Sequence, residues 1–549
     1  MKKQFAIGMS TTLVLSLLAT ACSKNNGAES TPTPLPENSN VTAAGTFPVV
    51  KDKVNLKIFT VADPNIENME TNELTKEYEA KTNVHIDWML VPSKDMEQKR
   101  NLLLASNAEM PDIFMNAKIS NVQQVQFGSQ GVIRPLNDLI DKYGFHIKKM
   151  FEANPVIKKM ITAPDGKIYA LPSVAEVLHT QYGQKLWINQ AWLTKLGLKM
   201  PTTTDELYTV LKAFKEKDPN GNGKADEIPL TGATSGYMTS VYHFIMSAFV
   251  YDKGWDDKPF ILDNGKVSVA YNQQGWKEGL LFLNKLYKEG LLDKGAITQD
   301  NAQLKQLGDN KDVTLLGAVT AGAMTGFMAA GTPRQKEYTT VPPLKGPSGF
   351  QSTGYYPYQV DSTKVVITTA SKNPEAAIRW IDWFYSIEGS MRGNAGRLDV
   401  EWRYGKQGEL GLNGKPGSFY RMLKFGQTQN VHWNTNPPGF ITEAWRSASI
   451  VEPTDQEAIL YNETNKNYVP YKPKEVLPPL YMTAEESEEY AGIDFSIMDY
   501  LKQTTARFVV GDLDIEKEWN NYLKELDRMG LKKYIELTQK AYDRQYGKK

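Results

Sequence analysis

Residues 54–61 read VNLKIFTV, an apolar run rich in β-formers. A helical pattern, TNELTKEYEAKT (71–82), and a second strand-like run, NVHIDWMLV (83–91), follow it. The alternation continues through the helical stretch DMEQKRNLLLAS (95–106) to the short apolar run DIFM (112–115). Because strands that alternate with helices in this way form mostly parallel sheets covered by helices, this part of the chain predicts a doubly wound α/β fold.

Similar patterns recur further along the chain. KLWINQAWLTKLGL (185–198) predicts a strand and a helix, residues 204–216 predict a helix, and VTLLGAV (313–319) predicts a strand. STKVVITTASKNPEAAIRWIDWFYS (362–386) combines a strand, a turn and an amphipathic helix that begins at a proline, and the last third of the chain is mainly helical. A chain of 549 residues exceeds one comfortable core, so we expect at least two domains.

The overall composition excludes one class of partner and favours another. Lys+Arg and Asp+Glu both number 63, so no net charge attracts nucleic acid. Aromatic residues make up 11% of the chain, with 11 Trp and 27 Tyr. Large cores account for most of them, and some are expected to line a groove for flat, polar ligands such as sugars.

The N-terminus carries the pattern of an export signal. A basic start, MKK, precedes the uncharged apolar run FAIGMSTTLVLSLLATA (5–21), and the single cysteine, Cys22, follows directly. The order of these parts resembles a bacterial lipoprotein signal, which predicts a signal peptide over 1–21 and lipidation of Cys22. The alternative is a plain signal peptide with an incidental cysteine. Residues 22–50, rich in Ser, Thr, Asn and Pro, are predicted to be the lipidated cysteine and a disordered tether.

The stretch KDPNGNGKADEIPL (217–230) suggests a cation site. Asp218, Asn220 and Asn222 alternate as in the first half of an EF-hand loop, but Pro229 occupies the position where an EF-hand has its bidentate glutamate. Hard oxygen ligands in this number suit Ca²⁺. The alternative is a polar turn with solvated carboxylates. The predicted ligands are Asp218, Asn220, Asn222, the carbonyl of Lys224, Asp226 and Glu227.

Several motifs, in one consistent order, resemble a known family. They are EMPDIFM (109–115), DGKIYALP (165–172), LWINQAWLTKLGL (186–198), ASKNPEAAIRWIDWFYSIEG (370–389) and NNYLKELDRMGLKKYIELTQKAYDR (520–544). Together with the lipoprotein-like start they are similar to the extracellular solute-binding proteins (family 1) of ABC importers. The resemblance is strongest to the large lipoproteins that serve oligosaccharide uptake, including the alginate-oligosaccharide-binding type.

This resemblance implies an α/β, two-lobed, periplasmic-binding-protein-like fold of class II type, with a hinge that the chain crosses more than once and a helical C-terminal part. The implied N-terminal lobe comprises 51–178 and 362–438, and the C-terminal lobe comprises 179–361 and 439–549. Crossings are expected near 175–182, 359–364 and 430–445. The alginate-binding type carries calcium at positions that match the loop in the C-terminal lobe, which implies a structural Ca²⁺.

Ligand-binding residues are predicted from aromatic or charged side chains near the crossings or in polar loops. Arg397 and Glu401 are expected to bond sugar hydroxyls or a uronate, with a surface ion pair as the alternative. Four tryptophans on helical patterns, Trp192, Trp380, Trp383 and Trp519, are expected in the core instead. The full predicted ligand set is Tyr182, Trp187, Trp255, Tyr355, Arg397, Glu401, Trp402 and Trp433.

The predicted function is the lipid-anchored, monomeric binding subunit of an ABC importer on the extracytoplasmic face of a bacterial membrane, with a Gram-positive surface favoured. It would capture an oligosaccharide between two lobes and deliver it to a membrane permease. The alternatives are the same fold with a peptide or signal as ligand, and a secreted carbohydrate-active enzyme. Five scattered histidines and the lack of a nucleophile-elbow or P-loop motif argue against an enzyme.

Overall fold

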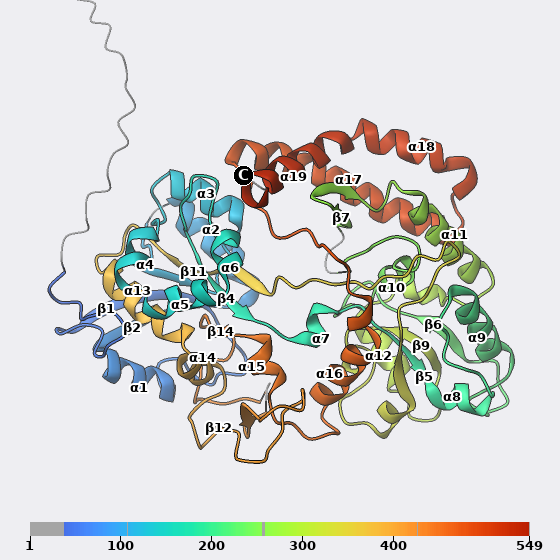
Figure 1. Cartoon of the computed structure of the whole chain (residues 1–549), viewed down its shortest axis with the longest axis horizontal. Coiled ribbons are helices and arrows are strands. Elements are labelled where there is room, and N and C mark those ends of the chain that lie inside the picture. Colours follow the sequence, from blue (N-terminus) through green and yellow to red (C-terminus); the bar gives the residue numbers. More distant parts are fainter. Residues whose placement is uncertain (1–37, 107, 255–257, 425–426, 548–549) are drawn as a thin grey trace, which may run out of the picture. The chain divides into compact units, whose positions relative to one another are not determined.

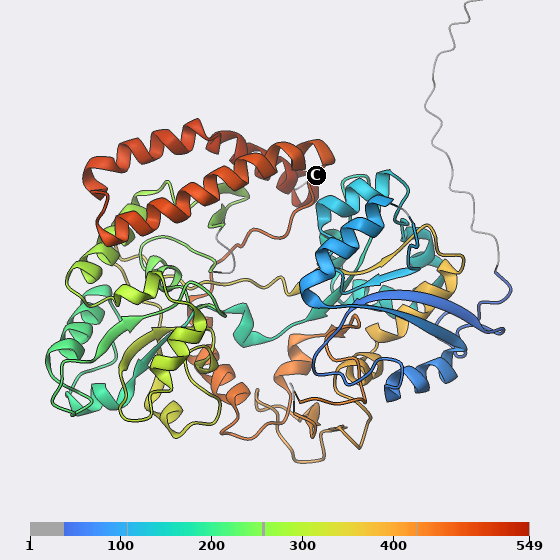
Figure 2. The same cartoon turned by 180° about the vertical axis from the view of Figure 1, so that it is seen from behind.

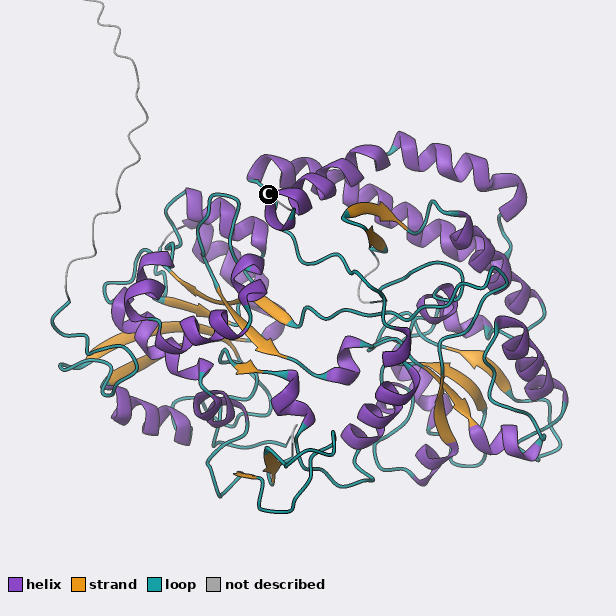
Figure 3. Ribbon diagram, viewed as in Figure 1, coloured by secondary structure: helices purple, strands orange, loops and turns teal. Residues whose placement is uncertain are grey.

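The computed structural model describes residues 38–106, 108–254, 258–424 and 427–547, and within them the chain forms two α/β lobes, each around its own sheet (Figures 1 and 3). The predicted signal peptide, Cys22 and Trp255 lie outside the described residues. No helix in these ranges is both long enough and apolar enough to cross a membrane.

The first lobe is built on a six-stranded sheet. Its strands, in spatial order, are β14 (Phe440–Ile441), β4 (Leu171–Ala175), β11 (Val360–Ile367), β3 (Ile113–Met115), β1 (Val54–Val61) and β2 (Val84–Val91). Strand β1 pairs in parallel with β2 and β3, and β4 pairs in parallel with β14. Strand β11 is antiparallel to both of its neighbours, β3 and β4. The predicted β-α-β-α-β start of the fold is confirmed.

The second lobe is built on a four-stranded sheet. Its strands, in spatial order, are β10 (Tyr338–Val341), β5 (Leu186–Asn189), β9 (Leu316–Thr320) and β6 (Ile228–Thr231). Strands β6 and β9 are parallel, and β5 is antiparallel to β9 and β10. In each lobe, therefore, the reversed strand, β11 or β5, is the strand that the chain forms on arriving from the other lobe.

Helices flank both sheets. Those that follow strands of the first lobe are α1 (Glu73–Thr82), α2 (Met96–Ser106), α3 (Asn121–Ser129), α4 (Asn137–Tyr143), α5 (Phe145–Ala153), α6 (Pro155–Met160), α13 (Pro374–Asp382), α14 (Ile387–Asn394) and α15 (Glu443–Ser447). Those of the remaining chain are α7 (Leu178–Gln181), α8 (Gln190–Lys195), α9 (Thr204–Glu216), α10 (Val241–Met246), α11 (Gln274–Lys288), α12 (Asn301–Gly308), α16 (Gln456–Asn467), α17 (Ala484–Val510), α18 (Ile515–Arg528) and α19 (Leu531–Tyr546). The last three lie together (Figure 2). Two small hairpins complete the described strands, β7 (Phe260–Asp263) with β8 (Lys266–Val269) and β12 (Trp402–Tyr404) with β13 (Phe419–Arg421).

Two segments that cross between the lobes are joined by one side chain. The chain leaves the first sheet after β4 and returns before β11. Gln359, which precedes β11, accepts a hydrogen bond from the backbone N–H of Val177 and donates one to the hydroxyl of Thr180. Its carbonyl also accepts from the N–H of Ala175. The outgoing and returning segments are therefore tied side by side.

A third passage between the lobes lies further along the chain than the sequence indicates. Strand β14 belongs to the first sheet, and Ile450 forms a bridge with Tyr420 of β13. Helix α16 then packs against β10 and α7. The predicted boundary at 438/439 is therefore wrong, and the passage lies between Ile450 and the start of α16. A two-residue strand such as β14 has too short an apolar run to be recognised from sequence.

The segment before α17 passes back to the first lobe once more. Val476 and Leu477 are buried in the core of the second lobe. Tyr481, four residues beyond Leu477, is buried in the core of the first lobe, where its hydroxyl donates to Oε1 of Gln124 at 2.7 Å. The link between them contains Pro478 and Pro479. One residue of the predicted C-terminal lobe is thus a core residue of the other lobe.

Residues 39–50, which were predicted to belong to the tether, are part of the fold. Val49 and Val50 are fully buried, and Val50 forms a bridge with Val41. Buried Arg379 of α13 donates to the carbonyls of Ala43 and Thr46 at 2.7 and 2.6 Å. The polar composition of the stretch as a whole concealed the few contacts that hold it in place.

Glu486 connects the beginning of α17 to the end of α19. It caps α17 by accepting from the N–H of Thr483 at 2.9 Å, and Arg544 of α19 donates to both of its oxygens at 2.9 and 2.8 Å. Lys540 lies 3.0 Å away. Burial alone would raise the pKa of Glu486, but these hydrogen bonds outweigh it and lower the pKa from its ordinary value of 4.5 to about 2.

Replacing Glu486 with Gln is therefore expected to lower the free energy of unfolding at pH 7 by on the order of 2 kcal/mol. Since the folded-state pKa is depressed, the contribution is fully present above about pH 4.5 and is lost as the pH falls towards 2. Thermal melts from pH 7 to 2 should show the difference between wild type and E486Q shrink below pH 4.5. The exposed Glu488 of the same helix supplies the control E488Q. An E486Q deficit that persists unchanged at pH 2 would contradict this assignment.

Candidate functional site

In open α/β sheets, ligands bind outside the carboxyl ends of the strands. In the first lobe, β1 and β3 end at this edge, and a polar residue lies within two residues of each strand end. Asp63 lies two residues after β1, and Asn116 comes directly after β3. Both side chains are half-buried.

A hydrogen-bonded network holds these two residues. Asn434 donates to Oδ2 of Asp63 at 2.7 Å, and Asn116 donates to Oδ1 of Asn436 at 3.0 Å. The ammonium of Lys364, on β11, donates to Oδ1 of Asn116 at 2.9 Å. Burial lowers the pKa of Lys364 to about 8. The edge of the first lobe is thus a preorganised polar surface drawn from segments far apart in sequence.

The backbone of this edge is strained. Asn116, Lys118 and Asn434 have φ values of 56°, 52° and 54°, in the left-handed region that non-glycine residues seldom occupy. Such residues persist only where the surrounding structure holds them, and they gather at functional sites. The strain therefore supports a functional role for this edge.

The corresponding edge of the second lobe is covered by the loop 232–240. The backbone carbonyl of Thr239 accepts hydrogen bonds from the N–H of Ala233 at 2.9 Å and from the hydroxyl of Thr320, the last residue of β9, at 2.8 Å. The N–H of Gly322 donates to the carbonyl of Tyr237 at 2.9 Å. The loop is therefore fixed across the carboxyl ends of β6 and β9.

Three of the predicted ligand-binding tryptophans are core residues. Trp187 and Trp433 are fully buried and Trp402 is 1% exposed. Their indole N–H groups donate, respectively, to the carbonyl of Ala321 at 2.9 Å, the hydroxyl of Thr75 at 2.9 Å and the carbonyl of Gly396 at 3.1 Å. A ring without exposed surface offers no face to a ligand, so these three predictions are wrong.

Trp433 shows why the surrounding sequence misled. It stacks on Trp380 with ring centroids 5.7 Å apart and also contacts Phe384 and Tyr78. The polar stretch that carries Trp433 folds over α13 and closes this aromatic cluster. The four tryptophans predicted for the core, Trp192, Trp380, Trp383 and Trp519, are all buried.

Tyr182 and Tyr355 come together at the crossing, as their positions in the sequence suggest. Their ring centroids lie 4.7 Å apart, and both residues are buried. The carbonyl of Tyr355 accepts from the hydroxyl of Tyr251 at 3.0 Å, and the ammonium of Lys472 lies 4.9 Å from its ring centroid. The pair packs the hinge region, and its rings are covered by protein.

Arg397 and Glu401 form the ion pair that was the alternative to ligand binding. Arg397 donates to both oxygens of Glu401, at 3.1 and 2.6 Å, and its guanidinium also lies 2.6 Å from Glu73. Burial opposes ionisation of Glu401, but the bonds from Arg397 hold its pKa below the ordinary value. With its partners satisfied, the pair positions the loop that contains Trp402.

The predicted calcium loop converges on two carboxylates. The amides of Asn220 and Asn222 both donate to Asp226, at 2.8 and 2.9 Å, and Asp218 accepts from the N–H groups of Gly221 and Gly223, each at 3.0 Å. The φ values of Gly221 and Gly223, 78° and 73°, permit the turn. Across the described residues, no three carboxylate, imidazole or thiol groups meet in a set that could hold a metal ion.

Glu227 is the unsatisfied member of this loop. Its Oε2 is buried and has no hydrogen-bond partner among the described residues. Burial raises the pKa of Glu227, and the nearby carboxylates of Asp218 and Asp226 raise it further. A cation would offset both effects, so the donor set fits a hard divalent ion.

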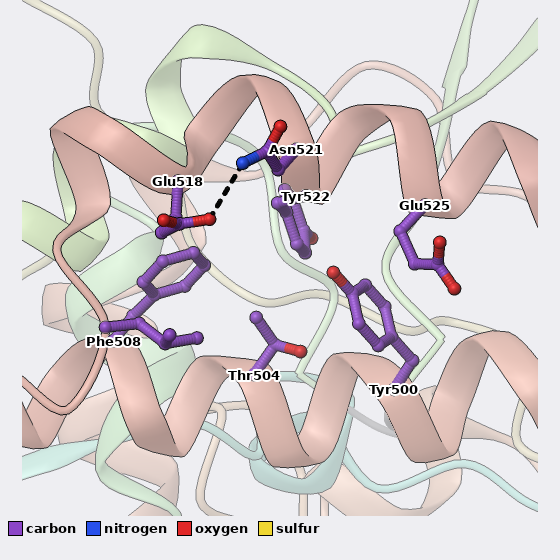
Figure 4. Close-up of a pocket in the computed structure, with 8 residues that line it drawn as sticks. Tyr500, Thr504, Phe508, Glu518, Asn521, Tyr522 and Glu525 are labelled. Atoms are coloured by element: carbon purple, nitrogen blue, oxygen red, sulfur yellow. Dashed lines mark hydrogen bonds between the residues drawn. The ribbon is translucent and has the colours of Figure 1, made fainter.

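A separate pocket lies between α17 and α18 (Figure 4), where the side chains of Tyr500, Glu518 and Glu525 point into it. Its lining comes from these two helices and their connection. None of the residues at the carboxyl edges of the sheets contributes to it, so it is not the candidate site.

Sequence reasoning missed Asp63, Asn116 and Tyr237. A signal for the first two existed, because polar residues that directly follow the strands of a parallel sheet meet at one edge. Tyr237 had no comparable signal, since it lies in a short polar loop, GATSGYMTS (232–240), between a strand and a helix.

Comparison with known proteins agrees with this architecture. The family model for bacterial extracellular solute-binding proteins matches residues 67–391. Over 520 residues the chain is 33% identical to the fructooligosaccharide ABC transporter substrate-binding protein FusA of Streptococcus pneumoniae, and the match covers 91% of each chain. The structure of FusA in complex with kestose covers 89% of this chain and 99% of FusA, with 30% identity and a TM-score of 0.73.

Other solved structures show the same fold. An HMO-binding, ABC-transporter-associated solute-binding protein from Bifidobacterium longum infantis covers 90% of this chain and 100% of its own, with 25% identity and a TM-score of 0.77. The alginate-binding protein AlgQ2 without calcium ion covers 90% and 99%, with 26% identity and a TM-score of 0.65. A FusA EF-hand mutant in complex with fructo-nystose matches at 31% identity, with coverage of 89% and 99% and a TM-score of 0.72.

The left-handed conformation of Asn116 leads to a stability prediction. Both Asn116→Gly and Asn116→Ala remove its side-chain hydrogen bonds, but only alanine keeps the Cβ, which is strained at a φ of 56°. We expect N116G to be more stable than N116A by about 1 kcal/mol, measured as the free energy of unfolding in urea. Asn264, in the β7–β8 turn, also has a left-handed φ, of 49°. The variants N264G and N264A are therefore the matched control and should differ in the same direction. Equal stabilities of N116G and N116A would contradict the strain at this edge.

Proposed function

The chain belongs to the bacterial extracellular solute-binding proteins, and we propose that it is the binding subunit of an ABC importer that captures an oligosaccharide. The observation that carries the proposal is the similarity to FusA over 91% of both chains. The polar edges of the two lobes, joined by paired crossing segments, are the arrangement that such a role needs.

Capture requires a sugar to contact both lobes at once. Asp63, Asn116 and their network supply hydrogen-bonding groups on the first lobe, and the loop 232–240 supplies the surface of the second. A ligand that touches both edges stabilises the closed arrangement relative to the open one, which shifts the population towards closure. The protein performs no chemistry on the sugar, and the closed form is what a membrane permease receives.

The proposed attachment to the membrane is through the lipidated Cys22. The chain then runs to residue 39, where the described fold of the first lobe begins. The bonds from Arg379 to Ala43 and Thr46 hold the first residues of that fold in place. A lipid-anchored monomer of this kind works on the extracytoplasmic face of the membrane, beside its permease.

The loop 218–227 is proposed to hold a structural Ca²⁺. The orphaned Oε2 of Glu227 and the clustered charge of Asp218 and Asp226 support the assignment. Asp218, Asn220, Asn222, the carbonyl of Lys224, Asp226 and Glu227 would hold the ion. Bound there, the ion would neutralise the carboxylates and pin the connection between α9 and β6, without contact to the sugar.

The oligosaccharide role predicts binding without turnover. Isothermal titration of the mature chain with kestose, with a neutral mannose oligosaccharide and with an alginate oligosaccharide should give saturable binding to at least one of them. Product analysis by chromatography should show the bound sugar unchanged. Release of shorter sugars would support the carbohydrate-active enzyme instead. The absence of binding to any of the sugars would favour a peptide or signal ligand.

The calcium role predicts a metal-dependent melting temperature. Saturating Ca²⁺ should raise it by several degrees over the EDTA-treated protein, because an ion that binds only the folded state stabilises that state by mass action. Asp226→Asn should remove most of this increase. The exposed Asp312, elsewhere in the same lobe, supplies the control D312N, which should respond as wild type does. A melting temperature that is the same in EDTA and in Ca²⁺ would overturn the assignment.

A further inference from the structure

Tyr237 is an exposed aromatic residue at the candidate site. Its relative exposure is 39%, whereas most large aromatic side chains of the second lobe are buried. It lies in the loop 232–240, which covers the carboxyl ends of β6 and β9. An exposed ring at the edge where α/β proteins bind their ligands is a candidate contact surface.

The ring of Tyr237 packs against the backbone at a glycine. A Cβ added at Gly322 would lie 2.2 Å from Cε1 of the tyrosine ring, and one added at Gly183 would lie 3.4 Å from its hydroxyl oxygen. Gly322 comes two residues after β9, and Gly183 comes three residues before β5. A side chain at Gly322 would collide with the ring, whereas a Cβ at Gly183 would come no closer than contact distance to its hydroxyl, so Gly322 forms the seat for the ring.

The seat is rigid on both sides of Tyr237. Its carbonyl accepts from the N–H of Gly322 at 2.9 Å, and the next residue, Met238, has a φ of 56°. The amide of Gln184 lies 3.2 Å from the sulfur of Met238 and donates to the carbonyl of Gly254 at 3.0 Å. Because the loop is fixed, little side-chain or loop freedom remains to be lost when a ligand binds.

The ring therefore packs closely against Gly322, while 39% of the surface of the residue remains exposed. Burial raises the pKa of Tyr237 to about 12, and the side chain is neutral at physiological pH even at its ordinary pKa of 10. A neutral aromatic face suits the apolar C–H face of a sugar ring better than a charged group. Orienting hydrogen bonds for the same sugar are available on the first lobe, from Asp63 and Asn116.

We propose that Tyr237, seated on Gly322, is the aromatic platform of the second lobe on which one ring of the bound oligosaccharide stacks. The inference rests on the proposed oligosaccharide function. It makes Tyr237 a determinant of affinity for sugars that present an uncharged ring face.

The test is a titration of four variants with kestose, or with whichever sugar of the panel above the wild type binds. Tyr237→Ala and Tyr237→Leu should weaken binding by about tenfold or more, since both remove the aromatic face while leucine still fills the seat. Tyr237→Phe keeps the face and should stay within about threefold of wild type. Tyr404→Ala removes a tyrosine of similar exposure, 46%, on β12, and should bind as wild type does.

The possible outcomes separate the inference from the function on which it rests. If Y237A or Y237L binds the sugar as tightly as wild type, the platform is overturned and the oligosaccharide function stands. A loss in Y237F as large as that in Y237L would also overturn it, because the hydroxyl would then carry the contact. Wild-type protein that binds no sugar overturns both. Thermal melts of each variant verify folding, and Y237L replaces Y237A if the alanine protein does not fold.

Discussion

The fold depends on the pairing of the two segments that cross between the lobes. One amide, that of Gln359, bonds the N–H of Val177 and the hydroxyl of Thr180 on the outgoing segment while its own backbone begins the returning one. Each segment then enters the next sheet as its reversed strand, β5 or β11. Each reversed strand runs against both of its neighbours, β3 and β4 around β11 and β9 and β10 around β5, so this pairing joins an inner strand of each sheet to the crossing. It also brings the two carboxyl edges to the crossing, where a ligand can contact both.

The part of the fold that could be predicted from the sequence is the part whose strands and helices are long enough to show a periodic pattern. Strands β1 and β2, with the helix between them, are long enough for their periodicity to show, and their predicted ranges agree closely with the structure. Strand β14 has two residues, and the segment 39–50 is held mainly by two buried valines and the bonds from Arg379. Contacts of this kind are made between distant parts of the chain, so no local pattern records them.

The residues of the candidate site show even more clearly that contacts between distant parts of the chain leave no local sequence pattern. The polarity around Trp402 and Trp433 describes their neighbours in sequence, but burial is decided by what folds over them, which in the case of Trp433 is the cluster with Trp380 and Tyr78. Asp63 and Asn116 were within reach of sequence reasoning, because their positions directly after strands carry geometric information. Tyr237 was not, because the packing of its ring depends on Gly322, a glycine that lies 85 residues after it.

The proposed closure must also accommodate a constraint outside the crossings. Leu477 is anchored in the core of the second lobe and Tyr481 in the core of the first, and Pro478 and Pro479 lie between them. Proline fixes φ, so this link has few angles through which to move. The hydroxyl of Tyr358, close to Gln359, donates to the carbonyl of Val476 at 3.1 Å, which connects the stiff link to the returning segment. The proposed closure must therefore leave both anchors in place, which favours rotation about the crossing region over sliding of one lobe past the other.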